Sequence, residues 1–571
     1  FVSFWGTNNC DHQARICHST TVAGVANTWG YGAMTNSYND MQNSKAMLFI
    51  GSNAAEAHPV SMLHTLHAKE SGAKMIVCDP RFTRTAAKAD QYIRFRSGSD
   101  IAVLFGILYH IFKNGWEDQK YLNDRVFGME KVREDVLAKW TPDKAFEVCG
   151  VTEEQLFKAA ETMAMNRPST IVWCMGQTQH TIGNAFVRAS CILQLALGNV
   201  GKSGGGANIY RGHDNVQGAT DIGPNPDSLP GYYGIPIGSW KYWCGVWGVD
   251  FEWVKKQFAS EGMMTKSGIT VSRWIDGVLE KNDLIDQDPN LKAVFYWGHA
   301  PNSQSRGLEM KRAMDKLDLL VVVDPYPSAT AAMAAMPGAD AKELNPNRAV
   351  YLLPACTQFE TSGSATASNR SLQWREKVID PLFESRTDQM IMYQLAEKLG
   401  FGKELVKNYK MVQGKGGTEP ETESILREIN RGVWTIGYTG QSPERLKLHM
   451  KHMNTFDPKT LRAKGGPCDG DYFGLPWPCY GTPELKHPGT PNLYDTSKHV
   501  MEGGGNFRAN FGVEKDGVNL LAEDGSASKG ADLQFGYPEF DHVLLKKLGW
   551  WDELTDEEKA KAEGKNWKTD T

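Results

Sequence analysis

The chain of 571 residues is long enough for three or four domains with large buried cores. Its formal net charge of −5 gives no basic surface for nucleic acid, and no apolar run approaches the roughly 18 residues of a membrane-spanning helix. We therefore expect partners of other kinds, with no nucleic acid and no membrane among them.

The ten cysteines form no C-x-x-C pair and no clustered set, which argues against a zinc site or a self-contained iron–sulfur site. Most are expected to be buried thiols in a reducing compartment, so we predict a cytoplasmic protein. The chain opens on Phe1-Val2-Ser3-Phe4-Trp5, without Met or a signal peptide. This start is typical of a domain interior and indicates a fragment, or numbering that begins inside a longer protein.

A cysteine followed directly by a histidine, Cys17-His18, separates a polar loop from a run of small residues that is expected to open a helix. A helix N-terminus and a neighbouring imidazole both favour the thiolate, which suits a nucleophile or a ligand for a soft metal. By itself, a Cys-His pair is more often incidental than functional.

Strand and helix patterns alternate through the next 180 residues. Residues 45–50, 74–78, 91–95 and 169–174 are short apolar runs typical of buried parallel strands. Helices are expected over 55–71, from a Ser99 cap to 113, and over 184–197. This spacing predicts an α/β fold with a doubly wound sheet.

Ligands of such sheets bind beyond the carboxyl ends of the strands, where this chain has polar residues and glycines. Carboxylates and amides there can accept from ribose or guanine, an arginine can pair with pyrophosphate, and glycines let the backbone come close. The same residue types also occur in ordinary turns and caps. The candidate cofactor contacts of this half are Gly51, Asn53, Glu56, Cys78, Asp79, Arg81, Gly98, Asp100, Met175, Gly176, Gln179 and Gly212.

The glycine-rich run 198–208 contains Gly-Lys-Ser but lacks the first Gly of a phosphate loop, and no evident helix follows it. We expect its glycines to let the backbone pass close to a large ligand. Arg211 comes next, and its planar guanidinium can bind a carboxylate through two hydrogen bonds. Without further information, a structural ion pair explains an arginine equally well.

A second unit of nucleotide-binding type follows. Predicted strands at 294–297, 319–323 and 349–354 surround a helix that starts near 308. Beyond about residue 410 the pattern becomes irregular, with a charged helix expected over 552–565. The likeliest contacts of a second nucleotide arm are Gly298, Asn302, Asp324 and Thr330.

Three separated motifs resemble the molybdenum- or tungsten-dependent formate dehydrogenases, and most of all the catalytic alpha subunits of the soluble NAD-dependent enzymes. They are Cys17-His18, Gly32-Ala33-Met34-Thr35-Asn36, and Arg211-Gly212-His213-Asp214-Asn215-Val216-Gln217-Gly218. The resemblance covers nearly the whole chain. It implies two Rossmann-like, doubly wound nucleotide-binding domains of the molybdopterin oxidoreductase fold, joined by irregular segments.

The resemblance also implies a bis-molybdopterin guanine dinucleotide cofactor whose molybdenum or tungsten is bound by Cys17. Arg211 would hold formate, His213 would face the metal, and His18 would sit beside it, with both of its charge states accessible near neutral pH. Formate would be oxidised to CO2 by hydride transfer to the metal centre, and CO2 reduction would be the reverse reaction. Gly176 and Gln179 match positions that line the cofactor in the family.

In the resembled enzymes, electrons pass through iron–sulfur clusters to a flavin- and iron–sulfur-containing partner subunit that reduces NAD. None of the cluster cysteines is present, and a C-terminal domain is expected to follow Thr571. We divide the chain into a remnant of a preceding domain (1–12), a domain with the metal-ligand cysteine and the first nucleotide site (13–213), a second nucleotide-binding domain (214–356), and a pterin-proximal segment with an irregular, partly helical extension (357–571).

Three alternatives remain. Another enzyme with this cofactor, such as a nitrate reductase, would use Cys17 equally well. A catalytically incompetent fragment could act as a scaffold for partner subunits. A plain NAD-binding dehydrogenase is disfavoured, since no strand is followed by a Gly-x-Gly-x-x-Gly turn.

Overall fold

A computed structural model describes residues 1–280, 290–299, 306–329, 347–480 and 486–495, with Ser497, Lys498 and short pieces after residue 501. These residues form two compact units, each assembled from separate stretches of the chain. The five-stranded unit contains residues 17–218, 365–373 and 435–571, and the three-stranded unit contains residues 1–16, 219–364 and 374–434. The sequence analysis proposed four consecutive segments instead, and that division stays a prediction.

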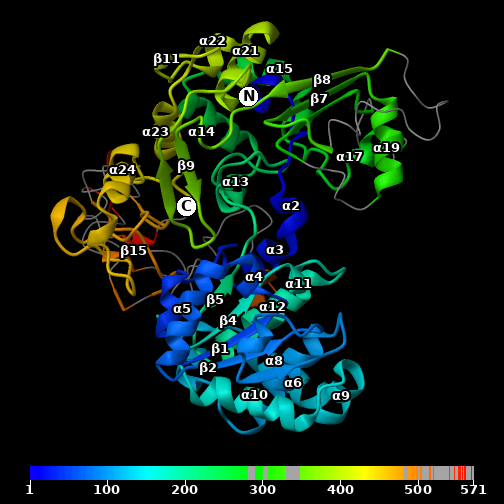
Figure 1. The fold of residues 1–571 in the computed structure, drawn as a ribbon, viewed down its shortest axis with the longest axis vertical. Coiled ribbons are helices and arrows are strands. Elements are labelled where there is room, and N and C mark those ends of the chain that lie inside the picture. Colours follow the sequence, from blue (N-terminus) through cyan, green and yellow to red (C-terminus); the bar gives the residue numbers. More distant parts are fainter. Residues whose placement is uncertain are drawn as a thin grey trace. The chain divides into compact units, whose positions relative to one another are not determined.

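The five-stranded unit is built on a parallel sheet in the order β3-β2-β1-β4-β5 (Figure 1). The central strand β1 pairs with β2 from Ala46↔Lys74 and with β4 from Ala46↔Ser169. The direction of winding reverses between β1 and β4, which is the place where doubly wound sheets bind ligands. The strands are β1 Ala46–Ile50, β2 Lys74–Cys78, β3 Gln91–Ile93, β4 Ser169–Trp173 and β5 Ala207–Ile209.

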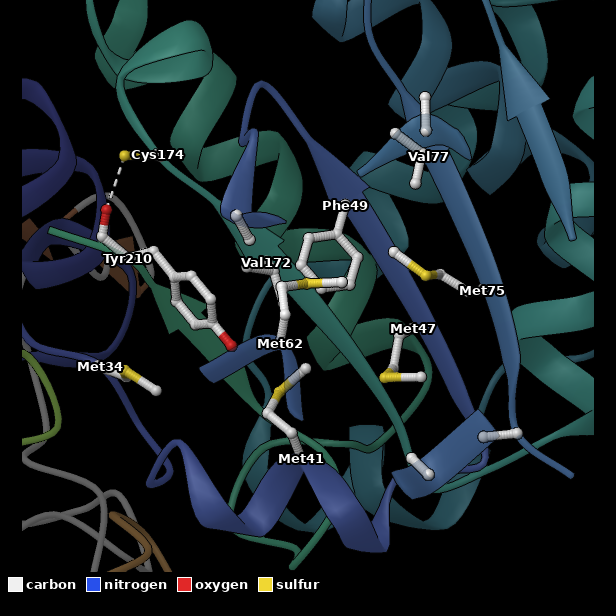
Figure 2. Packing of buried hydrophobic residues seen from close by; sticks show 14 residues of the cluster. Met34, Met41, Met47, Phe49, Met62, Met75, Val77, Val172, Cys174 and Tyr210 are labelled. Atoms are coloured by element: carbon white, nitrogen blue, oxygen red, sulfur yellow. Dashed lines mark hydrogen bonds between the residues drawn. The ribbon is translucent and has the colours of Figure 1, made fainter. Parts of the chain in front are cut away.

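One face of this sheet packs on a methionine-rich core (Figure 2). Met47 and Phe49 point to this face because alternate residues of a strand share a side. Met41 from the helix η1 and Met62 from the helix α5 close over them. The cluster reaches the carboxyl edge of the sheet at Cys174, whose Sγ donates to the carbonyl oxygen of Tyr210 at 2.6 Å.

Helices α10 and α12 contact strands β1, β4 and β5, and α12 also packs on α3 and α6. The helices of this unit are α3 Ser19–Trp29, η1 Asn39–Asn43, α4 Ala54–Ala57, α5 Pro59–Glu70, η2 Ala86–Lys88, α6 Asp100–Lys113, α7 Gln119–Arg125, α8 Met129–Lys139, α9 Pro142–Cys149, α10 Glu153–Met165, α11 Met175–Thr178, α12 Gly183–Ala196, α24 Pro443–Lys451, η5 Met453–Thr455 and η6 Gly466–Cys468. Helix α2, Ala14–Cys17, spans the boundary between the units.

The three-stranded unit contains the parallel sheet β6-β7-β8, with β6 Ala293–Trp297, β7 Leu319–Asp324 and β8 Ala349–Pro354. Its helices and hairpin are α1 Val2–Trp5, α14 Ile237–Trp247, α15 Phe251–Gln257, α16 Glu261–Met264, α17 Trp274–Leu279, α19 Gly307–Lys316, α21 Asp388–Leu399, α22 Gly402–Leu405, β11 Met411–Gly414, β12 Gly417–Pro420 and α23 Thr422–Gly432. Helix α13, Val216–Ile222, and the strand pair β9 Gly363–Thr366 and β10 Leu372–Arg375 span the boundary.

The mixed α/β fold with parallel sheets is as predicted. The strand order within the described part of the three-stranded unit does not reverse, so a second doubly wound domain stays a prediction. The helix predicted over 55–71 is wrong in detail, because Pro59 begins a new helix and α4 ends before it. Ser99 is the N-cap residue of α6, but its hydroxyl donates to the Arg96 carbonyl oxygen at 2.5 Å instead of capping. The predicted helix over 552–565 lies largely outside the described residues.

Candidate functional site

Cys17 is the last residue of α2 and lies directly before the N-cap of α3. Its side chain is buried, and its Sγ–H donates to the Met175 Sδ at 3.5 Å. Met175 follows β4 at the carboxyl edge of the sheet. The thiol therefore lies at the edge where ligands of parallel sheets bind.

His18 is held by two threonines. Its Nδ1 lies 3.4 Å from both the Thr21 and the Thr178 hydroxyl oxygens, and these oxygens are 2.6 Å apart. Burial, followed by the charge of Arg211, lowers the pKa of His18 to about 3. The prediction that both charge states are accessible near neutral pH is therefore wrong for the chain itself: the ring is neutral.

The hydrogen bonds around these threonines also identify the tautomer of His18. Trp173 Nε1 donates to Thr21 Oγ1 at 3.2 Å, and Thr178 Oγ1 donates to the Cys174 carbonyl oxygen at 3.0 Å. An indole N–H can only donate and a carbonyl can only accept, so both hydroxyl protons point from Trp173 toward Cys174. His18 Nδ1 must then be the donor to the threonine oxygens. The bare acceptor is Nε2, which is buried and has no hydrogen-bond partner among the described residues.

Arg211 follows β5, the neighbour of β4, and is buried. Its Nη2 donates to the Gly32 carbonyl oxygen at 2.9 Å, and its Nη1 donates to Gln217 Oε1. Its own carbonyl oxygen accepts from His58 Nε2 at 2.7 Å. The guanidinium is close enough to His18 for its charge to oppose protonation of that ring. The structure thus brings Arg211 and His18 together, and these contacts orient the guanidinium.

The other predicted residues of this edge are more open. Gly212, His213 and Gln179 are exposed, and a side chain at Gly212 would meet nothing within 4 Å. Met175 is 38% exposed. His213 lies two residues after the motif's buried arginine, but the described contacts do not attach it to Cys17 or His18, so its role stays a prediction.

Asp100 is an unusual carboxylate. It follows β3 as the first residue of α6, it is 1% exposed, and neither of its oxygens accepts a hydrogen bond from another described residue. Burial raises its pKa to about 6, although the proximity of His180 lowers it. A buried acceptor without donors fits a ligand that brings N–H groups to this strand end.

The remaining polar candidates already have partners. Asn53 donates from Nδ2 to Glu56 Oε2 at 2.5 Å and accepts from the Thr85 hydroxyl at 2.9 Å. Asp79 Oδ1 accepts from the backbone N–H of Arg81 at 2.8 Å, while burial raises the pKa of Asp79. These contacts are those of ordinary turns, which leaves both interpretations open.

Gly51 and Gly176 pack directly on each other. Gly51 has φ +62°, and a Cβ there would lie 2.5 Å from the Gln177 nitrogen and 2.7 Å from the Gly176 carbonyl carbon. Gly176 N–H also donates to the Gly51 carbonyl oxygen at 3.0 Å. This contact accounts for both glycines without a ligand, so their cofactor assignment stays a prediction. Gly98, by contrast, has open space around its missing side chain.

Cys78 is fully buried at the end of β2, on the face opposite Val77, and burial raises the pKa of its thiol strongly. In the three-stranded unit, Gly298 follows β6 with φ +56°, its N–H donates to the Val323 carbonyl oxygen at 2.8 Å, and a side chain there would meet open space. Asp324 ends β7 and its Oδ1 accepts from the Tyr326 N–H at 3.0 Å. Asn302 and Thr330 lie outside the described residues.

Sequence analysis did not identify the residues that hold the central side chains: Thr21 and Thr178 around His18, and His58 and Gln217 around Arg211. The sequence did contain a signal for Thr21, because it is three residues after His18 and residues three apart on a helix are neighbours. Thr178 and His58 come from distant parts of the chain, so only the fold brings them close.

A family model of molybdopterin oxidoreductases matches residues 3–398, well over half of the chain. The chain belongs to the molybdopterin oxidoreductase family. The structure is also similar to that of acetylene hydratase from Pelobacter acetylenicus, with a TM-score of 0.52 and 20% identity over 75% of this chain and 54% of that one. At this identity the likeness shows the fold alone.

Among curated molybdopterin oxidoreductase relatives, the alpha subunit of F420-dependent formate dehydrogenase from Methanocaldococcus jannaschii is 34% identical over 79% of this chain and 59% of the relative. The alpha subunit of F420-dependent formate dehydrogenase 1 from Methanococcus maripaludis is 31% identical over 88% of this chain and 63% of the relative. Formate dehydrogenase H from Escherichia coli is 31% identical over 69% of this chain and 51% of the relative. The chain thus spans between half and two thirds of the length of these relatives.

The described residues fit a molybdopterin-type cofactor at the carboxyl edge of the five-stranded sheet. Asp100 has two buried oxygens that lack donors, as the N–H groups of a guanine would supply, and His18 Nε2 is a buried acceptor. No group of three or more His, Cys, Asp or Glu side chains in the described ranges is arranged to hold a metal ion. Cys17 is accordingly a candidate single protein ligand to a metal whose other ligands come from a cofactor. In the same ranges, none of the helices has the length and apolar character needed to span a bilayer.

Proposed function

We propose that this chain is the catalytic core of a formate dehydrogenase that uses a molybdenum or tungsten bis-molybdopterin guanine dinucleotide. The observation that carries the proposal is that Cys17, His18 and Arg211 lie at one edge of the five-stranded sheet: Cys17 contacts Met175, which follows β4, and Arg211, whose charge acts on His18, follows the adjacent β5. The named formate dehydrogenase subunits among the relatives support the substrate.

When bound, the cofactor supplies the two-electron chemistry. Cys17 ligates its metal as a thiolate, which is the protonation state that binds metals. Arg211 binds the formate carboxylate by charge-assisted hydrogen bonds, in an orientation set by Gln217 and Gly32. His18, which follows Cys17 in sequence, offers its bare Nε2 as an acceptor, and His213 would face the metal, as the motif implies.

We assign the guanine dinucleotide arms to the strand ends of the two units. In the five-stranded unit, Asp100 accepts hydrogen bonds from guanine, and the open backbone at Gly98 leaves room for it. In the three-stranded unit, Gly298 and Asp324 lie at the carboxyl ends of neighbouring strands, the positions at which parallel sheets bind nucleotides. The other contacts of the two arms are those named from the sequence.

The electron acceptor is proposed to be NAD, reached through iron–sulfur clusters and a flavin-containing partner subunit in the complete protein. The relatives carry other acceptors in their names, F420 in two archaeal proteins and cytochrome c-553 in a bacterial one. Formate oxidation by the complete complex should be assayed with NAD, F420 and a cytochrome in parallel. NAD reduction at a rate well above the other two supports the proposal, and reduction of F420 or cytochrome alone contradicts this part of it.

The assignment is tested on the full-length protein by elemental analysis and formate-dependent dye reduction. Cys17→Ala should lose activity and weaken metal retention, whereas Arg211→Ala should keep the metal and raise KM for formate strongly, because it removes a substrate contact. Cys191→Ala is the matched control, since Cys191 is a buried thiol of α12 that lies outside the three motifs.

Molybdenum or tungsten at one equivalent supports the proposal if activity is lost in Cys17→Ala, KM for formate is strongly raised in Arg211→Ala, and Cys191→Ala behaves as wild type. Metal with turnover of nitrate and none of formate moves the enzyme to another activity of the same cofactor. A full-length protein without metal or pterin contradicts the enzymatic assignment and leaves a scaffold role.

A further inference from the structure

A cavity lies at the edge of the five-stranded sheet opposite to the proposed cofactor site. It has a volume of about 680 Å³ and is lined by residues that precede β1, residues that precede β5, and the helix α7. All five strands are parallel, so these residues mark the amino-terminal edge, whereas the cofactor residues proposed above follow the carboxyl ends. Ser37 and Asp40 represent the first group, and Gly201 and Lys202 the second.

The cavity is strongly cationic although the chain as a whole carries a net charge of −5. Its two lining carboxylates are Asp40 and Asp495. A cavity of similar size in the three-stranded unit, about 620 Å³, has the opposite balance, with more carboxylates than lysines among its lining residues. The cationic residues of the first cavity are Arg125, Lys202, Lys459, Arg462, Lys464 and Lys498.

The cations are gathered in pairs on two tyrosine rings of the wall. Lys202 Nζ lies 5.6 Å from the ring centroid of Tyr121, and Arg125 Cζ lies 5.9 Å from the same centroid. Cation–π contact lowers the cost of holding each charge, but two like charges on one ring still repel each other. An anion between them relieves this repulsion.

The second pair repeats the arrangement. Lys498 Nζ lies 5.6 Å and Arg462 Cζ 5.9 Å from the ring centroid of Tyr472, and Lys498 also donates to the Tyr472 hydroxyl at 3.2 Å. The two pairs thus form two separate positive centres that line the same cavity. Each centre has the charge and the N–H donors to bind one phosphate group.

The nearby carboxylates neutralise only part of this charge. The Asp40 carboxylate is hydrogen-bonded within the fold: it accepts from Asn36 Nδ2 at 2.7 Å and from the Gly204 N–H at 2.6 Å. Asp495 accepts from the Ser497 hydroxyl at 2.5 Å and lies 3.9 Å from Lys498. Three of the lysines have carboxylate partners, but Lys459 and Arg462 form no ion pair within the described ranges.

We propose that this cavity binds a small molecule that carries two linked phosphate groups, such as pyrophosphate or a nucleoside diphosphate. A volume of about 680 Å³ is within the range of small-molecule sites, roughly 300–1,000 Å³. Two cation pairs match two phosphates. The cavity is partly open to the surface, and its volume, which is that of a small-molecule site, favours a small ligand over an acidic segment of a partner protein. The site is independent of the redox assignment, since it lies at the other edge of the sheet.

The test is isothermal titration of the full-length protein with inorganic pyrophosphate at low ionic strength, followed by ADP. Arg462→Gln and Lys498→Gln are exposed substitutions that should leave the fold intact, as checked by thermal unfolding. Each should weaken binding by about tenfold or more, since each removes a direct charge contact. Equal affinity for the two ligands supports a site for the diphosphate alone, and tighter binding of ADP supports a nucleotide.

Two control variants distinguish this site from others. Lys241→Gln removes a lysine that lies 5.4 Å from the Phe251 ring centroid in the other unit, and binding should not change. Arg81→Gln removes a cation from the carboxyl edge of the sheet, and binding should again persist. Loss of binding in Arg81→Gln with retention in Arg462→Gln and Lys498→Gln overturns the proposal in favour of the cofactor site. Absence of pyrophosphate binding, or capture of an acidic peptide instead, also overturns it.

Discussion

The most informative single residue is His18, because its surroundings determine which of its nitrogens is available. A donor-only indole and an acceptor-only carbonyl terminate the chain Trp173–Thr21–Thr178–Cys174, which makes Nδ1 the donor. The threonines therefore act as positioning residues that keep Nε2 bare. Neither threonine would attract notice in a list of reactive side chains.

Thr178→Val removes the hydroxyl that positions His18 and preserves the shape of the side chain. We expect kcat for formate to fall by about tenfold with little change in KM, because His18 is no longer held in one tautomer, and stability to fall by about 1–2 kcal/mol. Steady-state kinetics and thermal unfolding measure the two effects. Thr28→Val is the control. The Thr28 hydroxyl donates to the Gly24 carbonyl oxygen at 2.7 Å within helix α3 and does not contact His18. An equal loss of kcat in both variants contradicts a specific role for Thr178.

Asp100 makes a prediction about pH. Its pKa in the folded chain is about 6, above its usual 3.8, so the folded state resists ionisation more than the unfolded state does. The contribution of Asp100 to the free energy of unfolding of the cofactor-free protein should therefore be highest below pH 4. It should fall by on the order of 3 kcal/mol as the pH rises from about 4 to 6.

Asp100→Asn removes the titration, so the difference in stability between wild type and variant should change with pH over that window and level off above it. Denaturant unfolding at several pH values measures this. Asp143→Asn is a control at an exposed position in the first turn of α9. A wild-type-minus-variant difference that does not depend on pH contradicts the buried, unpartnered state of the carboxyl.

At the scale of elements, apolar runs bounded by turn residues predicted β1, β2, β4, β6, β7 and β8 well. Strands β1 and β4 are fully buried and therefore largely apolar, whereas β6 and β8 are apolar runs that stay partly exposed. Strand β5 was missed because it has three residues and carries the polar Asn208. The interpretation that the run from residue 198 is not a phosphate loop is confirmed, because this run leads into strand β5 and no helix directly follows it. The local motifs Cys17-His18 and Arg211 were visible in sequence, while their holding residues required the fold.

The close contact of Gly51 with the backbone of α11 makes a testable prediction about the free energy of unfolding. An alanine there would combine φ +62° with a Cβ 2.5 Å from the Gln177 nitrogen, and main-chain atoms cannot move aside cheaply. We expect Gly51→Ala to lower stability by about 3 kcal/mol or more. Gly72→Ala is the matched control, since Gly72 has φ +97° with nothing within 4 Å, and it should cost only about 1 kcal/mol. Thermal unfolding compares the two, and equal costs would contradict the importance of the packing between β1 and α11.

At the scale of the whole molecule, the five-stranded unit joins stretches that are far apart in sequence, and Arg370 links them. Its guanidinium is fully buried and donates to the carbonyl oxygens of Met34 at 2.8 Å, Thr35 at 3.2 Å, Thr490 at 2.7 Å and Pro491 at 2.8 Å, and also to that of Trp477. One side chain thus satisfies five carbonyl groups from three regions of the chain.

Arg370→Lys keeps the charge but has three donors in place of five, so carbonyl groups are left buried without partners. We expect stability to fall by about 3 kcal/mol, with a lower unfolding temperature by circular dichroism. Arg94→Lys, at an exposed position, is the control and should have little effect. An unchanged unfolding temperature in Arg370→Lys would show that the three regions are held together by other contacts.

The discontinuity of the two units has a consequence for biosynthesis. Residues 1–16 belong to a unit whose next stretch begins at residue 219, and Cys17 belongs to a unit completed only by residues after 435. At ribosomal speeds of about 5–20 residues per second, the N-terminal segment waits roughly 10–40 s before its partners emerge. The nascent chain therefore exposes Cys17 before its surroundings exist. Insertion of the cofactor is therefore expected to follow translation of the stretch that begins at residue 435.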